Sequence, residues 1–215
     1  GRNGSWLLDP FDILVTDDVL KGSSGTTSPS FTANADSAVV QWSTISTALA
    51  AGTQVTVTTS ANGTGGSQNG DITIGIFKSP SVNVGGGGSL TFIADRNIDV
   101  QGTMGFFGAA MPLKFLAGRS GQGVIELPNT SINLQNGDIT FGGLTEFTRA
   151  GGGKFFGAAS YDAAHPIGVN LSSANINALN GTITINGGSK YQPASIGVNI
   201  SNSDLLARNI VRRLE

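Results

Sequence analysis

One octapeptide occurs twice in this sequence with a single substitution, as Gln68-Asn-Gly-Asp-Ile-Thr-Ile-Gly75 and as Gln135-Asn-Gly-Asp-Ile-Thr-Phe-Gly142. The two copies are 67 residues apart, and two similar strings that begin at Ile132 and Ile176 are 44 residues apart. Both offsets are multiples of about 22 residues, the length of one unit in several solenoid repeats. The repeats therefore predict a solenoid, in which each unit forms one coil and stacks on the next.

The units consist of short runs in which apolar and polar residues alternate, such as Gln54–Thr58 and Ser89–Ile93, bounded by Gly, Asn, Ser or Asp. Alternate side chains of a strand face opposite sides, so Ile72 and Ile74 are expected to point inward and Thr73 outward. One coil cannot bury its inward residues alone, whereas stacked coils pair their backbones and enclose a core. Asn and Gly suit the corners because both tolerate the left-handed backbone conformation.

The predicted fold is an all-β, right-handed parallel β-helix with one short helix and loop insertions, in a single domain over residues 1–215. The repeat length gives about six or seven coils between Gln54 and Ile200. The competing fold is an antiparallel sandwich or barrel, in which Asn136-Gly137 would form a hairpin turn. We favour the β-helix because a sandwich gives no reason for an octapeptide to recur.

Two parts of the sequence depart from the repeat. Residues 18–38 are rich in Gly, Ser and Thr without a strand pattern, and they predict a flexible loop insertion. A short helix is expected at Ser43–Ala51, with Ser43 as its N-cap and Gly52 ending it. Residues 1–15 and 42–53 are expected to form an end region.

An uncovered end coil exposes unpaired strand edges, which invite association. We therefore expect copies to stack end to end unless Trp6, Trp42 and the short helix cover one end.

The composition excludes several classes of protein. Charged residues make up 12% of the chain, too few for the polar faces of a helical bundle. A net charge of −2 gives no attraction for phosphate backbones, so we expect no nucleic-acid partner. No apolar run approaches the roughly 20 residues that cross a bilayer, so no transmembrane segment is expected. With no cysteine, disulfides and thiolate metal sites are excluded.

Several strings together resemble the large exoproteins of the two-partner secretion family, the filamentous-haemagglutinin-like adhesins. They are Ser5–Val15 (SWLLDPFDILV), Thr44–Thr59 (TISTALAAGTQVTVTT), Gly70–Ile74 (GDITI) and Ser89–Val100 (SLTFIADRNIDV). The likeness is tight over residues 5–15 and 42–102 and looser afterwards. The secretion domain of that family has no counterpart in the sequence, so the chain resembles an internal segment of a longer exoprotein.

The resemblance implies a segment of an exported bacterial adhesin, secreted or at the cell surface. In this interpretation a β-helical stalk displays loops that bind a receptor or glycan on a host or neighbouring cell. The resemblance also implies an outer-membrane transporter as the partner for export. Two alternatives remain open: a carbohydrate-active β-helix enzyme of the polysaccharide lyase or glycosidase type, and the stalk of a contact-dependent growth-inhibition effector.

The candidate residues for binding a glycan or a partner are aromatic. Neighbours in a strand face opposite sides, so one phenylalanine of each adjacent pair is expected in the core and the other outside. The outer ring either packs under a loop insertion or forms an exposed shelf for a sugar or a protein. The candidates are Phe106, Phe107, Phe155, Phe156, Tyr161 and Tyr191.

Nothing in the sequence predicts catalysis, a metal site or a cofactor. His165 is the single histidine, and we interpret it as a loop residue although Ser160 and Asp162 lie near it in sequence. Asp95 and Asp99 are interpreted as ordinary corner residues, and one histidine with two methionines is a poor ligand set for haem. A row of carboxylates with a basic residue on one exposed face would favour an enzyme. Exposed aromatic residues beside the insertions would favour a binding module, and a uniformly Thr-, Ser- and Asn-rich surface would favour a stalk.

Overall fold

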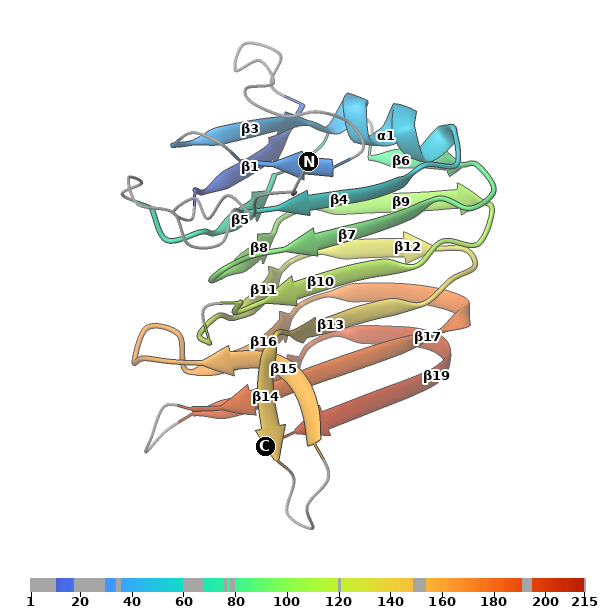
Figure 1. The fold of residues 1–215 in the computed structure, drawn as a ribbon. Coiled ribbons are helices and arrows are strands. Elements are labelled where there is room, and N and C mark those ends of the chain that lie inside the picture. Colours follow the sequence, from blue (N-terminus) through green and yellow to red (C-terminus); the bar gives the residue numbers. More distant parts are fainter. Residues whose placement is uncertain are drawn as a thin grey trace.

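In a computed structural model the chain winds into a right-handed column of stacked coils, whose strands run almost entirely parallel to their neighbours (Figure 1). The structure describes residues 11–17, 30–33, 36–59, 68–75, 77, 80–119, 121–148, 154–190 and 195–214. The predicted parallel β-helix is thus confirmed. The Asn136-Gly137 dipeptide lies at a corner between strands β12 and β13 of successive faces, and no antiparallel hairpin forms there.

The column has three faces, which we number in the order in which the chain visits them. Face 1 is a seven-stranded parallel sheet with the order β18-β16-β11-β8-β5-β1-β3. Its strands are β1 (Ile13–Thr16), β3 (Ala38–Gln41), β5 (Ile72–Ile74), β8 (Ile98–Val100), β11 (Ile125–Pro128), β16 (Ile167–Ser172) and β18 (Ile196–Ser201).

Faces 2 and 3 belong to one twelve-stranded sheet that bends around a corner, because β17 (Asn175–Ser189) and β19 (Asp204–Leu214) run through both faces. The first halves of β17 and β19 lie on face 2 with β6 (Ser81–Val84), β9 (Thr103–Gly108) and β12 (Ser131–Leu134). Their second halves lie on face 3 with β2 (Ser30–Thr32), β4 (Gln54–Thr58), β7 (Ser89–Ile93), β10 (Leu113–Ala117) and β13 (Ile139–Gly143).

The coils are longer than the repeat predicted. Ile72 pairs with Ile98, and Ile98 with Ile125, so these coils hold 26 and 27 residues. Ile132 does stack on Ile176, but their separation of 44 residues is one coil enlarged by an insertion and not two coils.

The two copies of the octapeptide do not stack at all. The first copy enters β5 on face 1, and the second enters β13 on face 3. The string Asn-Gly-Asp-Ile-Thr encodes a corner followed by an alternating strand, and two different corners of the coil can use it. The repeated string therefore reports local geometry, and the inference that the copies lie above one another was wrong.

The core is a column of side chains stacked in register. On face 3 the rings of Phe92, Phe115 and Phe141 stack with centroid separations of 5.4 and 5.3 Å, and none is exposed. On face 1 the inward residues of successive strands include Ile72 and Ile98, which are also fully buried. The inward Ile72 and Ile74 and the half-buried Thr73 confirm the predicted alternation.

At the N-terminal end, helix α1 (Trp42–Ala50) stands beside β6 and takes the place of a further strand on face 2 (Figure 1). Ile45 and Leu49 are buried, and the Trp42 ring stacks on Phe77 at 4.3 Å. Trp6, the other predicted anchor, lies outside the described residues.

The ends of α1 differ in part from the prediction. The N-cap residue is Gln41, without a side-chain cap, so the prediction of Ser43 as N-cap was wrong. Ser43 lies inside the helix, where its carbonyl accepts hydrogen bonds from the hydroxyls of Ser46 and Thr47. Gly52 follows the helix with a φ of +77°, as expected of a residue that ends it.

Part of the segment that was predicted to be a loop is a strand. Strand β2 lies within residues 18–38 and pairs with β4. Phe31, at the centre of β2, is 2% exposed. The loop prediction is therefore wrong for Ser30–Thr32, because one buried phenylalanine is too short a pattern to reveal a strand. Residues 18–29 and 34–35 lie outside the described residues.

Candidate functional site: the insertion edge

The three corners of the coil differ in the length of the connections that cross them. From face 1 to face 2, two residues join β8 to β9, β11 to β12, and β16 to β17. From face 3 to face 1 the connections are longer and vary, from residues 94–97 to residues 118–124 and 144–166. We call this corner, with residues 68–71 of an earlier coil, the insertion edge.

The longest insertion contains the antiparallel strands β14 (Thr145–Thr148) and β15 (Lys154–Ser160), which lie against the outer surface of the column (Figure 1). Gly188 of β17 makes room for them, because a Cβ atom there would lie 2.2 Å from the Phe147 ring. The last residues of β15 pair in parallel with the end of β17. The insertion is thus built into the sheet.

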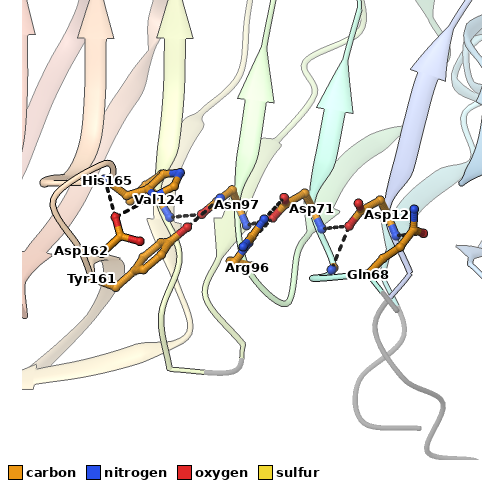
Figure 2. Close-up of polar contacts among 10 residues, drawn as sticks. Asp12, Gln68, Asp71, Arg96, Asn97, Val124, Tyr161, Asp162 and His165 are labelled. Atoms are coloured by element: carbon orange, nitrogen blue, oxygen red, sulfur yellow. Dashed lines mark hydrogen bonds and ion pairs between the residues drawn. The ribbon is translucent and has the colours of Figure 1, made fainter. Parts of the chain in front are cut away.

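A ladder of Asp and Asn side chains runs along the insertion edge (Figure 2). Asp12 Oδ1 accepts hydrogen bonds from Gly70 N at 3.0 Å and Asp71 N at 2.8 Å. Asp71 Oδ1 accepts one from Asn97 N at 2.9 Å, and Asn97 Oδ1 accepts one from Val124 N at 3.1 Å. Each side chain therefore satisfies backbone donors of the following coil and ties consecutive coils together.

Arg96 reinforces this ladder. Its guanidinium donates to both carboxylate oxygens of Asp71. Nε donates to Oδ1 at 2.8 Å, and Nη2 donates to Oδ2. The hydrogen bond to Asp71 raises the pKa of Arg96, while burial lowers it and the charge of Asp71 adds to the rise. A two-point contact of this kind fixes the planar guanidinium in one orientation.

The residues after β15 fold back onto the ladder (Figure 2). The Tyr161 hydroxyl accepts a hydrogen bond from Asn97 Nδ2 at 3.0 Å, and the His165 ring stacks on Tyr161 at 4.6 Å. Asp162 Oδ1 lies 2.9 Å from His165 Nδ1 and accepts a hydrogen bond from His165 N. Burial raises the pKa of Tyr161, so its hydroxyl stays protonated and polar at neutral pH.

The pKa of Asp162 is lowered. Desolvation alone would raise this pKa, but the hydrogen bonds from the side chain and backbone of His165 outweigh desolvation. Ser160 is fully buried, and its Oγ accepts a hydrogen bond from Lys190 N, so it is not presented as a nucleophile beside this pair. The Asp162–His165 contact therefore shapes the loop.

Asp95 was expected to be an ordinary corner residue, but it is 3% exposed. It accepts a hydrogen bond from Thr59 Oγ1 at 3.0 Å, and Arg119 Nε lies 3.6 Å from its carboxylate. Burial raises the pKa of Asp95, and Arg119 and Thr59 oppose this rise. Its contacts join the end of one coil to the end of the next.

The predicted split within each phenylalanine pair is confirmed. Phe106 is 3% exposed and packs edge-on against Trp42, whereas Phe107 is 42% exposed. Phe155 is buried against Phe147, whereas Phe156 is 54% exposed.

The outer rings Phe107 and Phe156 are not covered by an insertion, so the interpretation that an outer ring packs under a loop insertion was wrong. They also do not form one shelf, because β9 lies on face 2 and β15 lies outside face 3. Of the predicted aromatic candidates, Tyr161 alone contacts the ladder in the described part of the chain. Tyr191 lies outside the described residues.

Asp12, Asp71 and Asn97 were not predicted as a ladder, although the sequence holds a signal for them. Each precedes an inward isoleucine of face 1, in the strings DILV, DITI and NIDV. An Asp or Asn directly before such a strand marks the corner where its side chain reaches the next coil.

Face 1 also carries a pair of carboxylates on its outer surface. Asp99 and Glu126 are neighbours in register on β8 and β11, so Asp99 belongs to a strand and not to a corner. Burial raises the pKa of Glu126, His165 lowers it, and Asp99 raises it further. Within the described residues no group of three or more His, Asp or Glu side chains is arranged to hold a metal ion.

Comparisons with known proteins identify no relative: no protein-family model, no curated protein and no solved structure matches the chain. Across the ranges that the structure describes, none of the helices has the length and apolar character to span a membrane.

Proposed function

We propose that the chain is a stalk segment of an exported bacterial surface adhesin. Its insertion edge is displayed for attachment to a receptor or glycan on a host or neighbouring cell. One observation carries the proposal: three regular faces form a column, and from β7 onward the long connections gather at the corner from face 3 to face 1. A rod of this construction extends in one direction while it presents loops along one side.

The outer surface supports a stalk. On face 3, Thr56, Thr91, Thr140 and Thr184 occupy outward positions in register, with Lys114 between Thr91 and Thr140. Rows of short hydroxyl side chains keep a sheet surface hydrated without offering charged groups for chemistry. Side-chain oxygens of the Asp and Asn ladder accept hydrogen bonds from backbone N–H groups of the next coil. These bonds stiffen the column and leave fewer ladder oxygens to bind a substrate.

The export step, with an outer-membrane transporter as partner, is supported by the lack of cysteine and by contacts that run mainly between consecutive coils. A chain that passes a pore unfolded is held back by a cross-link between coils. We would place the chain behind the secretion domain of an adhesin in a bacterium with the matching transporter. The double variant Thr91→Cys/Lys114→Cys joins neighbouring strands at a spacing that a disulfide can span.

The expected result is that the unmodified chain and the reduced double variant reach the surface, while the oxidised variant stays in the periplasm. The single variant Thr91→Cys serves as the matched control. Retention of the unmodified chain, or equal export of the oxidised form, would contradict the proposal.

The attachment step is tested by a glycan array and a cell-binding assay. We expect binding to fall at least tenfold in Tyr161→Ala or Phe156→Ser, because both side chains belong to the insertion edge. The face 3 variant Thr140→Ser should bind like the parent chain. Equal binding by all of these variants would place attachment elsewhere on the molecule.

The carboxylate pair Asp99 and Glu126 favours a second candidate, a carbohydrate-active enzyme. Neighbouring parallel strands lie about 4.8 Å apart, which is close to the carboxylate separation of retaining glycosidases. The raised pKa of Glu126 is what a general acid requires. Release of reducing sugar from a panel of polysaccharides by the parent chain, lost in Glu126→Gln, would favour the enzyme over the stalk.

A further inference from the structure

A groove follows the corner between faces 2 and 3, on a different side of the column from the insertion edge. It consists of two hollows of about 360 and 450 Å³, which share Ala110 and Pro112. The first hollow begins at Gln54 on β4 and the second ends at Gly181 on β17. The groove therefore crosses the neighbouring strands β4, β7, β10, β13 and β17, a length of about 19 Å at the usual strand spacing. We call it the corner groove.

Glycines at this corner let consecutive coils approach closely. A Cβ atom on Gly181 would collide with the carbonyl oxygen of Gly137, and one on Gly137 would collide with that of Met111. The backbone itself therefore sets the depth of the second hollow. A recess of this kind is preformed, so a ligand that enters it loses little to reorganisation of the protein.

Two asparagines from consecutive coils line the corner groove. Asn180 Nδ2 donates a hydrogen bond to Asn136 Oδ1 at 3.2 Å, which orients both side chains. This bond uses one amide hydrogen and one oxygen lone pair, so among the described contacts each amide keeps donors and acceptors for a ligand. Gln54, Ser89 and Thr91 add an amide and two hydroxyls toward the other end of the groove. Such groups both donate and accept, as the hydroxyl groups of a sugar do.

The charge and the backbone of the corner groove narrow the class of ligand. In the described part of the chain its lining holds one cation, Lys114, and one anion, Asp138, which favours an uncharged ligand. Strand β10 pairs with β7 on one side and with β13 on the other. An extended peptide therefore finds no strand edge to join there, and recognition has to come from side chains. None of the described lining residues is aromatic, so one sugar is held weakly and several are needed.

We propose that the corner groove binds a linear, uncharged oligosaccharide that runs along the axis of the column. Successive sugar units lie over successive coils, and each unit exchanges hydrogen bonds with the amides and hydroxyls of the coil beneath it. The site lies apart from the insertion edge, so it goes beyond the attachment proposed for that edge and does not depend on Tyr161.

The test is titration calorimetry of the whole chain with cello-, xylo- and chito-oligosaccharides, from the disaccharide to the hexasaccharide. We expect the dissociation constant of at least one series to fall with each added unit up to the pentasaccharide and then to level off, because the groove is then filled. Oligogalacturonides of the same lengths carry a carboxylate on each unit and should bind more weakly.

The variant Asn136→Ala/Asn180→Ala removes hydrogen bonds to the ligand and should raise the dissociation constant about tenfold. The matched control is Asn170→Ala/Asn199→Ala, because these two asparagines share a hydrogen bond at 2.8 Å on face 1, outside the groove. Its affinity should equal that of the parent chain.

A blocking variant tests the groove without changing its asparagines. Ala110 is exposed and lines both hollows, so Ala110→Trp should abolish binding while its circular dichroism matches the parent chain. Four outcomes would overturn the proposal: no binding to any uncharged series, affinity that ignores chain length, parent-like binding by Ala110→Trp, or equal losses in the two asparagine variants. Tyr161→Ala should bind the oligosaccharide like the parent chain. Loss of binding in Tyr161→Ala with parent-like binding in the groove variants would overturn the groove and leave attachment at the insertion edge standing.

Discussion

Removal of the phenyl ring of Phe115 should destabilise the column more than any single change on its outer faces. Phe115 is fully buried and lies between the rings of Phe92 and Phe141, at 5.4 and 5.3 Å. A buried Phe→Ala change costs about 3–5 kcal/mol, and each lost ring pair contributes about 0.5–1.5 kcal/mol. Two stacking partners place Phe115→Ala at the upper end, at about 4–5 kcal/mol.

The assay is urea unfolding followed by circular dichroism and by tryptophan fluorescence. With a slope of about 3 kcal/mol per molar urea, the midpoint should fall by roughly 1.5 M. The matched control is Lys114→Ala, because Lys114 is the outward neighbour of Phe115 on the same strand. Its stability should stay within about 0.5 kcal/mol of the parent chain.

The two probes add a second comparison, because Trp42 lies at the N-terminal end whereas circular dichroism reports on all strands. Coincident transitions indicate that the coils unfold together. A loss of less than about 1.5 kcal/mol in Phe115→Ala would refute the view that the stacked rings hold the middle coils together.

Three further changes test other parts of the structure. Gly188→Ala should force the Phe147 ring away and release the hairpin, seen as faster proteolysis with little change in circular dichroism. Gly86→Ala, where a Cβ meets nothing within 4 Å, should cleave like the parent chain. Asp71→Ala should cost about 1–3 kcal/mol in urea unfolding because charged hydrogen bonds between coils are lost, and an unchanged midpoint would argue against the ladder. The folded-state pKa of Glu126 is raised, so stability should fall as pH rises from about 4.5 through that pKa. Glu126→Gln should flatten this fall, and an equal slope in both chains would argue against a raised pKa at the half-buried Glu126.

The fold was predictable from the sequence because strand alternation and corner residues are local. Ile72, Thr73 and Ile74 show their orientation within three residues, and Gly52 marks the end of α1 by its own backbone preference. Stacking register is not local, so the recurring octapeptide suggested neighbours that lie on different faces. The hairpin insertion also lengthens one coil to 44 residues, which obscured the true period.

The candidate site was less predictable than the fold. The alternation rule correctly predicted one buried and one exposed ring in each phenylalanine pair, but it cannot tell that the strands of Phe107 and Phe156 belong to different faces. Asp71 and Asn97 act on the next coil, 26 and 27 residues further along the chain, so their role depends on coil length. The burial of Asp95 could not be predicted, because its partners Thr59 and Arg119 are distant in sequence.

Helix α1 has a consequence for the order in which the molecule can assemble. Its contacts reach β3, β4 and β6 and, through Trp42, Phe106 of β9, so the surroundings of the helix are complete once residue 106 is available. Every later turn then meets a finished edge that already specifies direction and register, and growth from that edge needs no new nucleus. The coils around α1 can thus act as a seed, and later coils can be added to them in the order in which the polypeptide arrives.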